Sequence, residues 1–328
     1  MKKNQTVASD KWQVTSAGSR TADLVTRHPS PLPRRSEAKA GVTRTAFTLI
    51  EVMVVMALLS LIVIALMGVF NSTQAAFRAS VTQTDVLEGG RAAMDLMSGD
   101  LRAMSPSRGV YTNLNGCPVN FYAGVANAPL FTQPLIASSN QQRTNVLEEF
   151  FILSRENQTW TGTGYVVITN SVNGNPYSLY RFSMTTNVSA ANGPLMLFNN
   201  FINSPYTTYT NSPPWSHLLD GVITLRVRAY DPNGIWLTNG YAFQNMPTIK
   251  NTYFFAPVLG EVGFLMYSNT LPASVEIEMA TLEDRTLQRA ESRPVGPLRD
   301  AYLQGQAGKV HVFRQRVAIP NVDPAAYR

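Results

Sequence analysis

The sequence predicts an α+β fold in which one long N-terminal helix, with a transmembrane half and an amphipathic half, packs on an antiparallel β-sheet in a globular head. Three observations support this fold: an uncharged apolar run, a proline-free continuation with apolar residues at helical spacing, and a C-terminal part of short apolar stretches separated by Asn, Thr, Gly and Pro. With 328 residues, 45% of them hydrophobic, the chain is long enough to bury a core.

Residues 1–46 form a basic leader. They hold nine Lys or Arg against three Asp or Glu, and subtracting them from the 27 basic and 21 acidic residues of the chain leaves 18 of each downstream. The positive net charge therefore belongs to the leader alone. Because no dense basic face with interleaved aromatic residues follows, we expect no nucleic-acid partner.

Residues 47–70 predict a transmembrane helix. The run Val52–Phe70 has 19 residues and no charge, and at about 1.5 Å per residue it spans roughly 28 Å, about one bilayer core. The basic leader precedes it and Arg78 is the first positive residue beyond it, so the N-terminus is expected in the cytoplasm and the C-terminal part outside. The run is too long for an ordinary secretory signal peptide and no small-residue cleavage site stands out after it.

The residues at the head of this helix, Arg44-Thr-Ala-Phe-Thr-Leu-Ile-Glu-Val52, resemble the processing and methylation motif of type IV prepilins. In that family a membrane aspartic peptidase, the prepilin peptidase, cuts on the cytoplasmic side of the helix and N-methylates the new terminal residue. The resemblance implies a cut between Ala46 and Phe47, removal of the leader and an N-methylated Phe47. The family normally has Gly before the cut; because Ala46 is also small, we still expect cleavage.

Glu51 would be the fifth residue of the mature chain. A carboxylate at the edge of a bilayer helix is unfavourable without a partner, and cleavage creates one, because the new α-amino group of Phe47 is a cation at nearly the same depth. In the pilin family a glutamate at this position is thought to neutralise the N-terminus of a neighbouring subunit, so the resemblance implies an assembly role. The alternative is a glutamate that reaches the membrane interface and is favoured by the helix dipole.

The helix is expected to continue through residues 71–105 as an amphipathic segment. Asn71 to Met104 contains no proline, and Pro106 ends the pattern. An apolar stripe, expected to face the head, recurs at Leu87, Met94, Met97, Leu101 and Met104. Gly89-Gly90 is expected to weaken or kink the helix, at roughly 1 kcal/mol per glycine.

Residues 106–328 predict an extracytoplasmic, β-rich globular domain. Candidate strands are residues 149–154, 164–169, 178–184, 222–230, 235–238, 274–282 and 310–319. Alternate residues from Ile223 to Ala229 should form one buried face. Cys117 is the single cysteine, so no intramolecular disulfide is possible and we interpret it as a small, partly buried hydrophobe.

Asp231-Pro-Asn-Gly234 predicts a turn from which Ile235–Leu237 returns as the second strand of a hairpin. Asp231 and Asn233 also resemble part of a calcium loop, but the downstream acidic ligand is missing, so we expect a structural turn.

Three stretches, residues 94–102, 222–236 and 271–284, resemble the J-type minor pseudopilin of type II secretion. In that subfamily the subunit joins other minor pseudopilins at the filament tip, where it primes assembly. The resemblance does not extend to residues 109–214.

No catalytic, cofactor or metal site is predicted, and we expect no enzymatic activity. His28, His217 and His311 are isolated and lack zinc-ligand spacing, and neither a nucleophile elbow nor a phosphate-binding loop is present. Glu276 and Glu278 fall on one face of a candidate strand, which we interpret as its solvated side.

The sequence therefore predicts a minor pseudopilin precursor, processed by prepilin peptidase and assembled with other pseudopilins, through an inner-membrane assembly platform, into the pseudopilus of a type II secretion-like system. We expect a single-pass inner-membrane protein with a cytoplasmic N-terminus and a periplasmic C-terminal domain, located at the pseudopilus tip after assembly. The alternatives are a minor type IV pilin for adhesion, motility or DNA uptake, and a single-pass anchored binding protein that does not polymerise.

Overall fold

The computed structural model describes residues 47–109, 116–125, 131–134, 142–168, 177–190, 193–203, 214–238, 249–258, 260–294 and 296–327. The expected leader, residues 1–46, lies outside the described residues. The chain divides into two compact units, Met1–Val63 and Ile64–Arg328. The described part of the first unit holds the start of helix α1, and the second unit holds the rest of α1 and all described strands.

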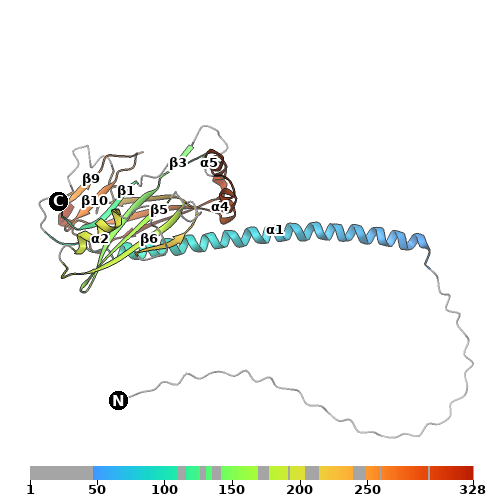
Figure 1. Cartoon of the computed structure of the whole chain (residues 1–328), viewed down its shortest axis with the longest axis horizontal. Helices are drawn as coiled ribbons and strands as arrows, with labels where there is room; N and C mark the ends of the chain where they lie inside the picture. The colour runs from blue at the N-terminus through green and yellow to red at the C-terminus, as the bar shows by residue number, and fades with distance from the viewer. Residues whose placement is uncertain are drawn as a thin grey trace, which may run out of the picture. The chain divides into compact units, whose positions relative to one another are not determined.

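Helix α1 spans Leu49–Arg102, a single element of 54 residues (Figure 1). Every side chain from Phe47 to Val81 is exposed. Within the part of the chain that the structure describes, α1 is the one helix long and apolar enough to cross a membrane. A long apolar N-terminal helix followed by an antiparallel β head confirms the predicted α+β, pilin-like layout.

The last part of α1 packs into the head. Its buried residues recur at helical spacing: Val86, Gly90, Ala93, Met94, Met97, Ser98 and Leu101. The expected stripe therefore does face the head, except that Val86 is buried where Leu87 is only half-buried. Each fully buried Met or Leu side chain contributes about 1.5–3 kcal/mol through removal of its surface from water.

Gly89-Gly90 do not break the helix, because α1 runs through both glycines without interruption. A Cβ placed on Gly90 would lie 2.3 Å from the ring of Phe313 in strand β12 (Val310–Ala318). Glycine at this position lets the helix approach the sheet closely, which offsets its low helix propensity.

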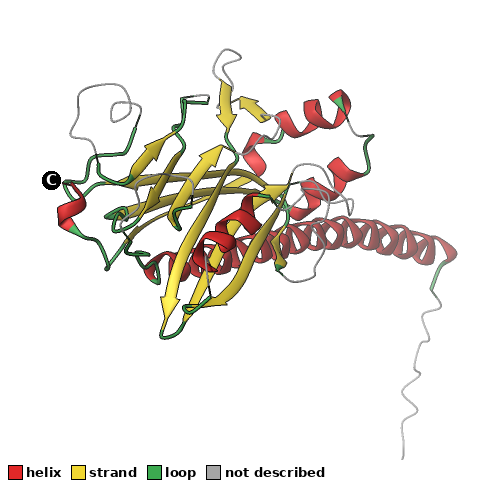
Figure 2. Ribbon diagram, turned by 60° about the vertical axis from the view of Figure 1, so that its left-hand side comes forward, coloured by secondary structure: helices red, strands yellow, loops and turns green. Residues whose placement is uncertain are grey.

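The described strands of the head form three antiparallel sheets; Figure 2 draws these strands in yellow. The largest has the order β7-β6-β5-β4-β1-β10-β9, the second has the order β12-β11-β8, and β2 pairs with β3. The strands not yet given are β1 (Val119–Val125), β2 (Phe131–Pro134), β3 (Gln142–Asn145), β4 (Glu148–Glu156), β5 (Thr159–Ile168), β6 (Ser178–Asn187), β7 (Trp215–Leu219), β8 (Val222–Tyr230), β9 (Thr252–Phe254), β10 (Phe264–Tyr267) and β11 (Ser274–Leu282).

Among the described residues, three shorter helices accompany the sheets: α2 (Gly193–Ile202), α4 (Asp284–Glu291) and α5 (Pro297–Gln304). Short 3-10 turns lie at Ala307–Lys309 and Pro324–Tyr327. Helix α2 packs on β5 and β6.

Two hydrophobic clusters fill the head. The larger one joins α1 to both the large and the three-stranded sheet and contains Met97 and Phe150. The smaller one lies between α2 and the large sheet and contains Phe151 and Phe201. Because consecutive residues of a strand point to opposite faces, Phe150 and Phe151 show that β4 is buried on both faces.

The predicted strands at residues 222–230 and 274–282 match β8 and β11 residue for residue. The predicted returning strand at residues 235–238 is wrong, because Tyr230 and Trp236 form only an isolated bridge. Further along that edge of β8, the residues directly before β4 contact Leu225: its N–H donates to the Val146 carbonyl at 3.0 Å, and Leu147 bridges it in parallel. A returning strand therefore has no free edge to follow.

Candidate functional site

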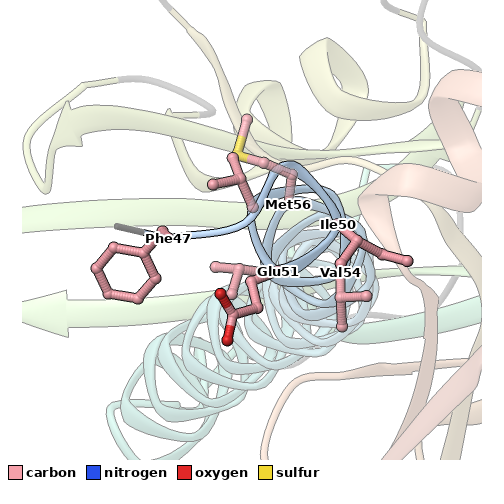
Figure 3. Close-up of a pocket in the computed structure, with 7 residues that line it drawn as sticks. Phe47, Ile50, Glu51, Val54 and Met56 are labelled. Atoms are coloured by element: carbon pink, nitrogen blue, oxygen red, sulfur yellow. The ribbon is translucent and has the colours of Figure 1, made fainter. Parts of the chain in front are cut away.

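The candidate site is the start of α1, where the sequence motif lies. Phe47 is 83% exposed and Ile50 is 70% exposed. A shallow depression along this segment is lined by Phe47, Ile50, Glu51, Val52, Val54, Val55 and Met56. Glu51 is the single charged group among them, and Figure 3 shows its carboxylate on the same side of the helix end as the Phe47 ring. Ile50 and Val54 point to another side.

Glu51 closes a capping box with Thr48. Its Oε2 atom accepts hydrogen bonds from the Thr48 main-chain N–H at 2.9 Å and from the Thr48 hydroxyl at 3.0 Å. In return the Glu51 N–H lies 3.4 Å from the Thr48 hydroxyl oxygen. This reciprocal pairing satisfies donors that the first turn of a helix otherwise leaves unpaired, and it places an anion at the positive end of the helix dipole.

The second carboxylate oxygen of Glu51 is available for another donor. Both hydrogen bonds from Thr48 use Oε2, and among the described residues Oε1 accepts no hydrogen bond. Phe47 directly precedes Thr48, so an α-amino group at Phe47 would lie one peptide unit from the N–H that Glu51 already binds. The site can therefore bind a cation through Oε1 while it caps its own helix through Oε2.

The exposed side chains of this segment determine what it can contact. An uncharged helix face whose apolar side chains are all exposed is unfavourable in water, and it is stabilised by lipid or by other helices. A single acid at the head of that face then requires a hydrogen-bond donor or a cation at the same depth.

The structure describes Phe47 and Glu51 but not Ala46, which lies outside the described residues, so the Ala46–Phe47 bond itself is not seen. Thr48 was missed at the sequence level. The pattern Thr48-Leu-Ile-Glu51 has the Thr-x-x-Glu spacing of a capping box directly before an apolar run, and this spacing was the available signal.

A second functional cluster, here called the Asp100 anchor, holds the end of α1 in the head. Asp100 accepts hydrogen bonds from Arg181 Nε at 2.9 Å and Arg181 Nη2 at 3.1 Å, and also from the Tyr165 hydroxyl. The Arg181 and Asp100 side chains are 23% and 20% exposed. Burial and the Asp100 charge raise the pKa of Tyr165 well above its usual value, so the hydroxyl remains a donor.

Glu148 is a buried carboxyl where the two larger sheets meet. It is 3% exposed, and its carboxyl accepts a hydrogen bond from the Val227 main-chain N–H. Burial raises the pKa of Glu148 to about 8; the neighbouring Glu261 also raises it, while the main-chain hydrogen bond, Arg226 and Arg228 lower it. Glu148 is therefore mostly protonated at neutral pH.

The interpretation of Glu276 and Glu278 as a solvated side is wrong. Glu276 is 8% exposed, and its Oε1 lies 2.7 Å from Arg314 Nη2 and 3.7 Å from Arg228 Nη1. Glu278 Oε1 lies 3.6 Å from Arg226 Nη1. The acids share one face, as the strand spacing predicts, but arginines from both neighbouring strands cover it.

The Asp231 carboxylate stabilises the turn that begins at this residue. Asp231 Oδ1 accepts a hydrogen bond from the Ile235 N–H at 2.7 Å, and the Gly234 N–H donates to the Asp231 carbonyl at 3.0 Å. These bonds form the predicted structural turn. Among the described residues no group of three or more His, Cys, Asp or Glu side chains is arranged to hold a metal ion.

Comparison with known proteins gave one match. Residues 43–67 match the family model described as the prokaryotic N-terminal methylation motif. No curated protein and no solved structure matched the chain. The matched segment contains Ala46, Phe47 and Glu51 and leads into the exposed apolar part of α1. The motif and the helix together support a type IV pilin-like protein, a substrate of prepilin peptidase with a single-pass membrane anchor.

Proposed function

We propose that this chain is the precursor of a minor pseudopilin that assembles into the pseudopilus of a type II secretion-like system. Prepilin peptidase would cut between Ala46 and Phe47 and methylate the Phe47 amine. The observation that carries the proposal is the match of residues 43–67 to the N-terminal methylation motif, directly at the start of the uncharged helix. The mature subunit would stay in the inner membrane, head in the periplasm, until it enters the filament.

The assembly step rests on Glu51. In the precursor the nitrogen of Phe47 is an uncharged amide, and among the described residues the carboxylate of Glu51 has only the Thr48 donors. After cleavage the Phe47 nitrogen becomes a cation, and a neighbouring subunit presents the same cation. Because Oε1 accepts no bond from the described residues, it can receive the amine of a neighbour without loss of the helix cap. Attraction between these charges is stronger where water is excluded, which favours docking at one axial offset.

The J-type assignment is supported by where the three resembling stretches lie in the head. Residues 94–102 are the end of α1, residues 222–236 contain β8 and its turn, and residues 271–284 contain β11. Strands β8 and β11 are paired, and both contribute to the cluster into which α1 packs. The resembling residues thus form one packed region, which includes Asp100 of the anchor. The proposed role is binding to other minor pseudopilins, without catalysis or a cofactor.

The processing proposal is tested by mass spectrometry of the N-terminal peptide, after expression with active and with inactivated prepilin peptidase. We expect an N-methylated peptide beginning at Phe47 with the active enzyme and an intact Ala46–Phe47 bond with the inactive one. Ala46→Gly, which restores the usual family residue, should also be cleaved, and Ala46→Leu should not. An intact bond with the active peptidase overturns the proposal and favours an anchored binding protein that does not polymerise.

The assembly proposal is tested with two substitutions that separate the cap from the charge. Glu51→Gln keeps an oxygen acceptor for the two Thr48 donors but has no charge, whereas Glu51→Ala removes the acceptor and the charge. Both variants should insert into the membrane, and both should fail to co-purify with the filament subunits. If Glu51→Gln is incorporated like the wild type and Glu51→Ala is not, the cap and not charge pairing directs incorporation, and the proposed mechanism is wrong.

A minor type IV pilin shares all of these N-terminal features, so the same N-terminal tests do not separate the two systems. Crosslinking from the head followed by identification of the partner does: other minor pseudopilins support the secretion system, whereas subunits of a retractable pilus support the alternative.

A further inference from the structure

The three-stranded sheet ends on strand β12. On one side β12 pairs with β11 over nine residues, from Val310 opposite Leu282 to Ala318 opposite Ser274. On its other side no strand pairs with it in the part of the chain that the structure describes. A long edge strand with an open side presents a row of main-chain donors and acceptors to which another strand can add.

The hydrogen-bond pattern shows which residues face the open side. The Ile319 N–H donates to the Ala273 carbonyl at 3.0 Å, and the Glu283 N–H donates to the Lys309 carbonyl at 3.1 Å. In an antiparallel pair such bonds recur at every second residue, so odd-numbered residues of β12 bond to β11 and even-numbered ones point their main-chain groups outward. The outward residues 312, 314, 316 and 318 also have exposed side chains.

Charges alternate across this sheet in two rows. In one row Glu276 of β11 lies opposite Arg228 of β8 and Arg316 of β12, and in the other Glu278 lies opposite Arg226 and Arg314. Each row therefore runs positive, negative, positive and ends at the open edge with an arginine. Opposite charges on neighbouring strands stabilise a sheet, and like charges directly opposite each other destabilise it.

The arginines at the edge are incompletely neutralised. Glu276 is shared between Arg314 at 2.7 Å and Arg228 at 3.7 Å. Arg226 also meets Glu261 at 2.8 Å, so the described residues place four arginines against three glutamates here. Glu148, mostly protonated at neutral pH, adds little negative charge.

The side chains at the edge are positioned but remain accessible. Arg314 is 55% exposed. Arg316 donates from Nε to the Ser274 hydroxyl at 2.8 Å and lies 3.7 Å over the Tyr230 ring, and no carboxylate of the described residues lies within ion-pair distance of it. Because Ser274 belongs to β11 and Tyr230 to β8, these contacts hold the guanidinium over the face of the three-stranded sheet.

We propose that the open edge of β12 binds an extended segment of another protein, with acidic side chains at every second residue. Main-chain bonds to residues 312–318 would add the segment as a fourth strand, and two acids would continue the charge rows beyond Arg314 and Arg316. The inference rests on the head alone and holds whether or not residues 43–67 are processed.

A second copy of this edge is a poor occupant. Antiparallel pairing of β12 with itself would bring the arginines of one strand toward those of the other, with no acid between them. Edge charges of this kind are also a common means by which proteins prevent edge-to-edge association. The same arginines therefore oppose self-pairing and favour an acidic strand.

The test uses the full-length protein in detergent micelles and fluorescent peptides measured by anisotropy. The probe is Thr-Val-Glu-Val-Glu-Val-Thr, with matched peptides that carry Gln or Lys in place of Glu. A fourth peptide keeps both Glu residues but is N-methylated at alternate amides. We expect the Glu peptide to bind about tenfold more tightly than the Gln peptide, as two cross-strand ion pairs allow. Raised salt should reduce this preference, and the N-methylated peptide should not bind.

Variants of the protein locate the site. Arg314→Gln with Arg316→Gln should abolish the preference for Glu over Gln peptide. Val312→Pro, which removes one outward N–H, should weaken all peptides because proline is tolerated at an edge but cannot donate there. The matched control, Arg285→Gln with Arg289→Gln on the exposed side of α4, should bind as the wild type does, and tryptophan fluorescence checks that each variant is folded.

Three results would overturn the proposal. If the Glu peptide binds the double variant of Arg314 and Arg316 as tightly as it binds the wild type, these arginines do not recognise the acidic side chains. Binding of the N-methylated peptide would show that the peptide binds through its charges and not by strand addition. A dimer of the wild type that Val312→Pro dissolves, detected by sedimentation, would identify a second copy as the occupant.

Discussion

Glu148 provides a quantitative test of the packing between the two larger sheets. Its carboxyl accepts the Val227 N–H inside the junction, and burial raises its pKa from 4.5 to about 8. In the unfolded chain it titrates near the ordinary glutamate value. Because the folded pKa is the higher one, the native state binds this proton more tightly, and its contribution to stability is lost as the pH rises.

The size of the effect follows from the two pKa values. Below about pH 4.5 both states are protonated and the contribution is fully present, and it declines until the folded carboxyl ionises near pH 8. Between about pH 5 and pH 8 the free energy of unfolding should fall by about 3 kcal/mol on account of Glu148, since one unit of pKa shift corresponds to about 1.4 kcal/mol. Above pH 8 the ionised carboxylate would remain buried, with Glu261 opposing it and Arg226 and Arg228 favouring it.

The assay compares wild type with Glu148→Gln, whose amide oxygen can accept the same N–H without ionising. Urea unfolding of the full-length protein in detergent, followed by tryptophan fluorescence, gives the free energy of unfolding at each pH. The difference in free energy of unfolding between the two proteins should change by about 3 kcal/mol between about pH 5 and pH 8, because titration of all other groups is common to both. A difference that stays constant with pH would refute the placement of Glu148 as a buried, protonated acid.

Other substitutions probe how α1 is held in the head. Gly90→Ala should destabilise the head by about 1–2 kcal/mol because its Cβ would meet the Phe313 ring, whereas Gly99→Ala, which has open space, should stabilise the helix by about 0.5–1 kcal/mol. Equal urea midpoints for these two variants would argue against the close approach. Asp100→Ala should cost about 1–3 kcal/mol because two partly buried donors lose their acceptor. Asp100→Asn should recover part of that loss. An Asp100→Ala protein as stable as the wild type would show that the Asp100 anchor does not stabilise the end of α1.

The sequence predicted those elements that have a simple local pattern and pack on one face only. The uncharged run, the stripe from Met94 to Met104 and the alternation in residues 222–230 are such patterns, and each corresponds to an observed element. The start of the candidate site was predictable for the same reason, since Phe47 and Glu51 lie in a contiguous motif at the head of the apolar run.

Elements buried on both faces were harder to predict. Strand β1 is buried at five of its seven positions, so it lacks the alternation that marks a half-buried strand. Strand β10 has only four residues, and its assignment depends on a partner, β1, that is more than a hundred residues away in the chain. Such pairing is tertiary information that local propensity does not contain.

The polar side chains were misjudged because their environment is also tertiary. Glu276 and Glu278 have the spacing of an exposed strand face, and a glutamate is rarely buried without a partner. The partners are arginines contributed by β8 and β12, strands separated from each other by about eighty residues of sequence. Gly90 is the same case: its helix propensity is poor in isolation, and the ring of Phe313 that favours it comes from the last strand.

The helix cap and the proposed assembly role of Glu51 fit a single order of events. Before the proposed cleavage, the described residues offer the acid at the helix start only neutral donors, so among them no cation pairs with its charge when that end enters lipid or packs against another helix. The proposed cleavage would convert the Phe47 nitrogen into a cation, and the helix end would then be neutral as a pair. The cap made by Thr48 keeps the helix start formed in both states, so the change is one of charge and not of shape. In the proposed function proteolysis would control assembly by supplying this cation, so a precursor that cannot be cut should insert normally yet remain outside the filament.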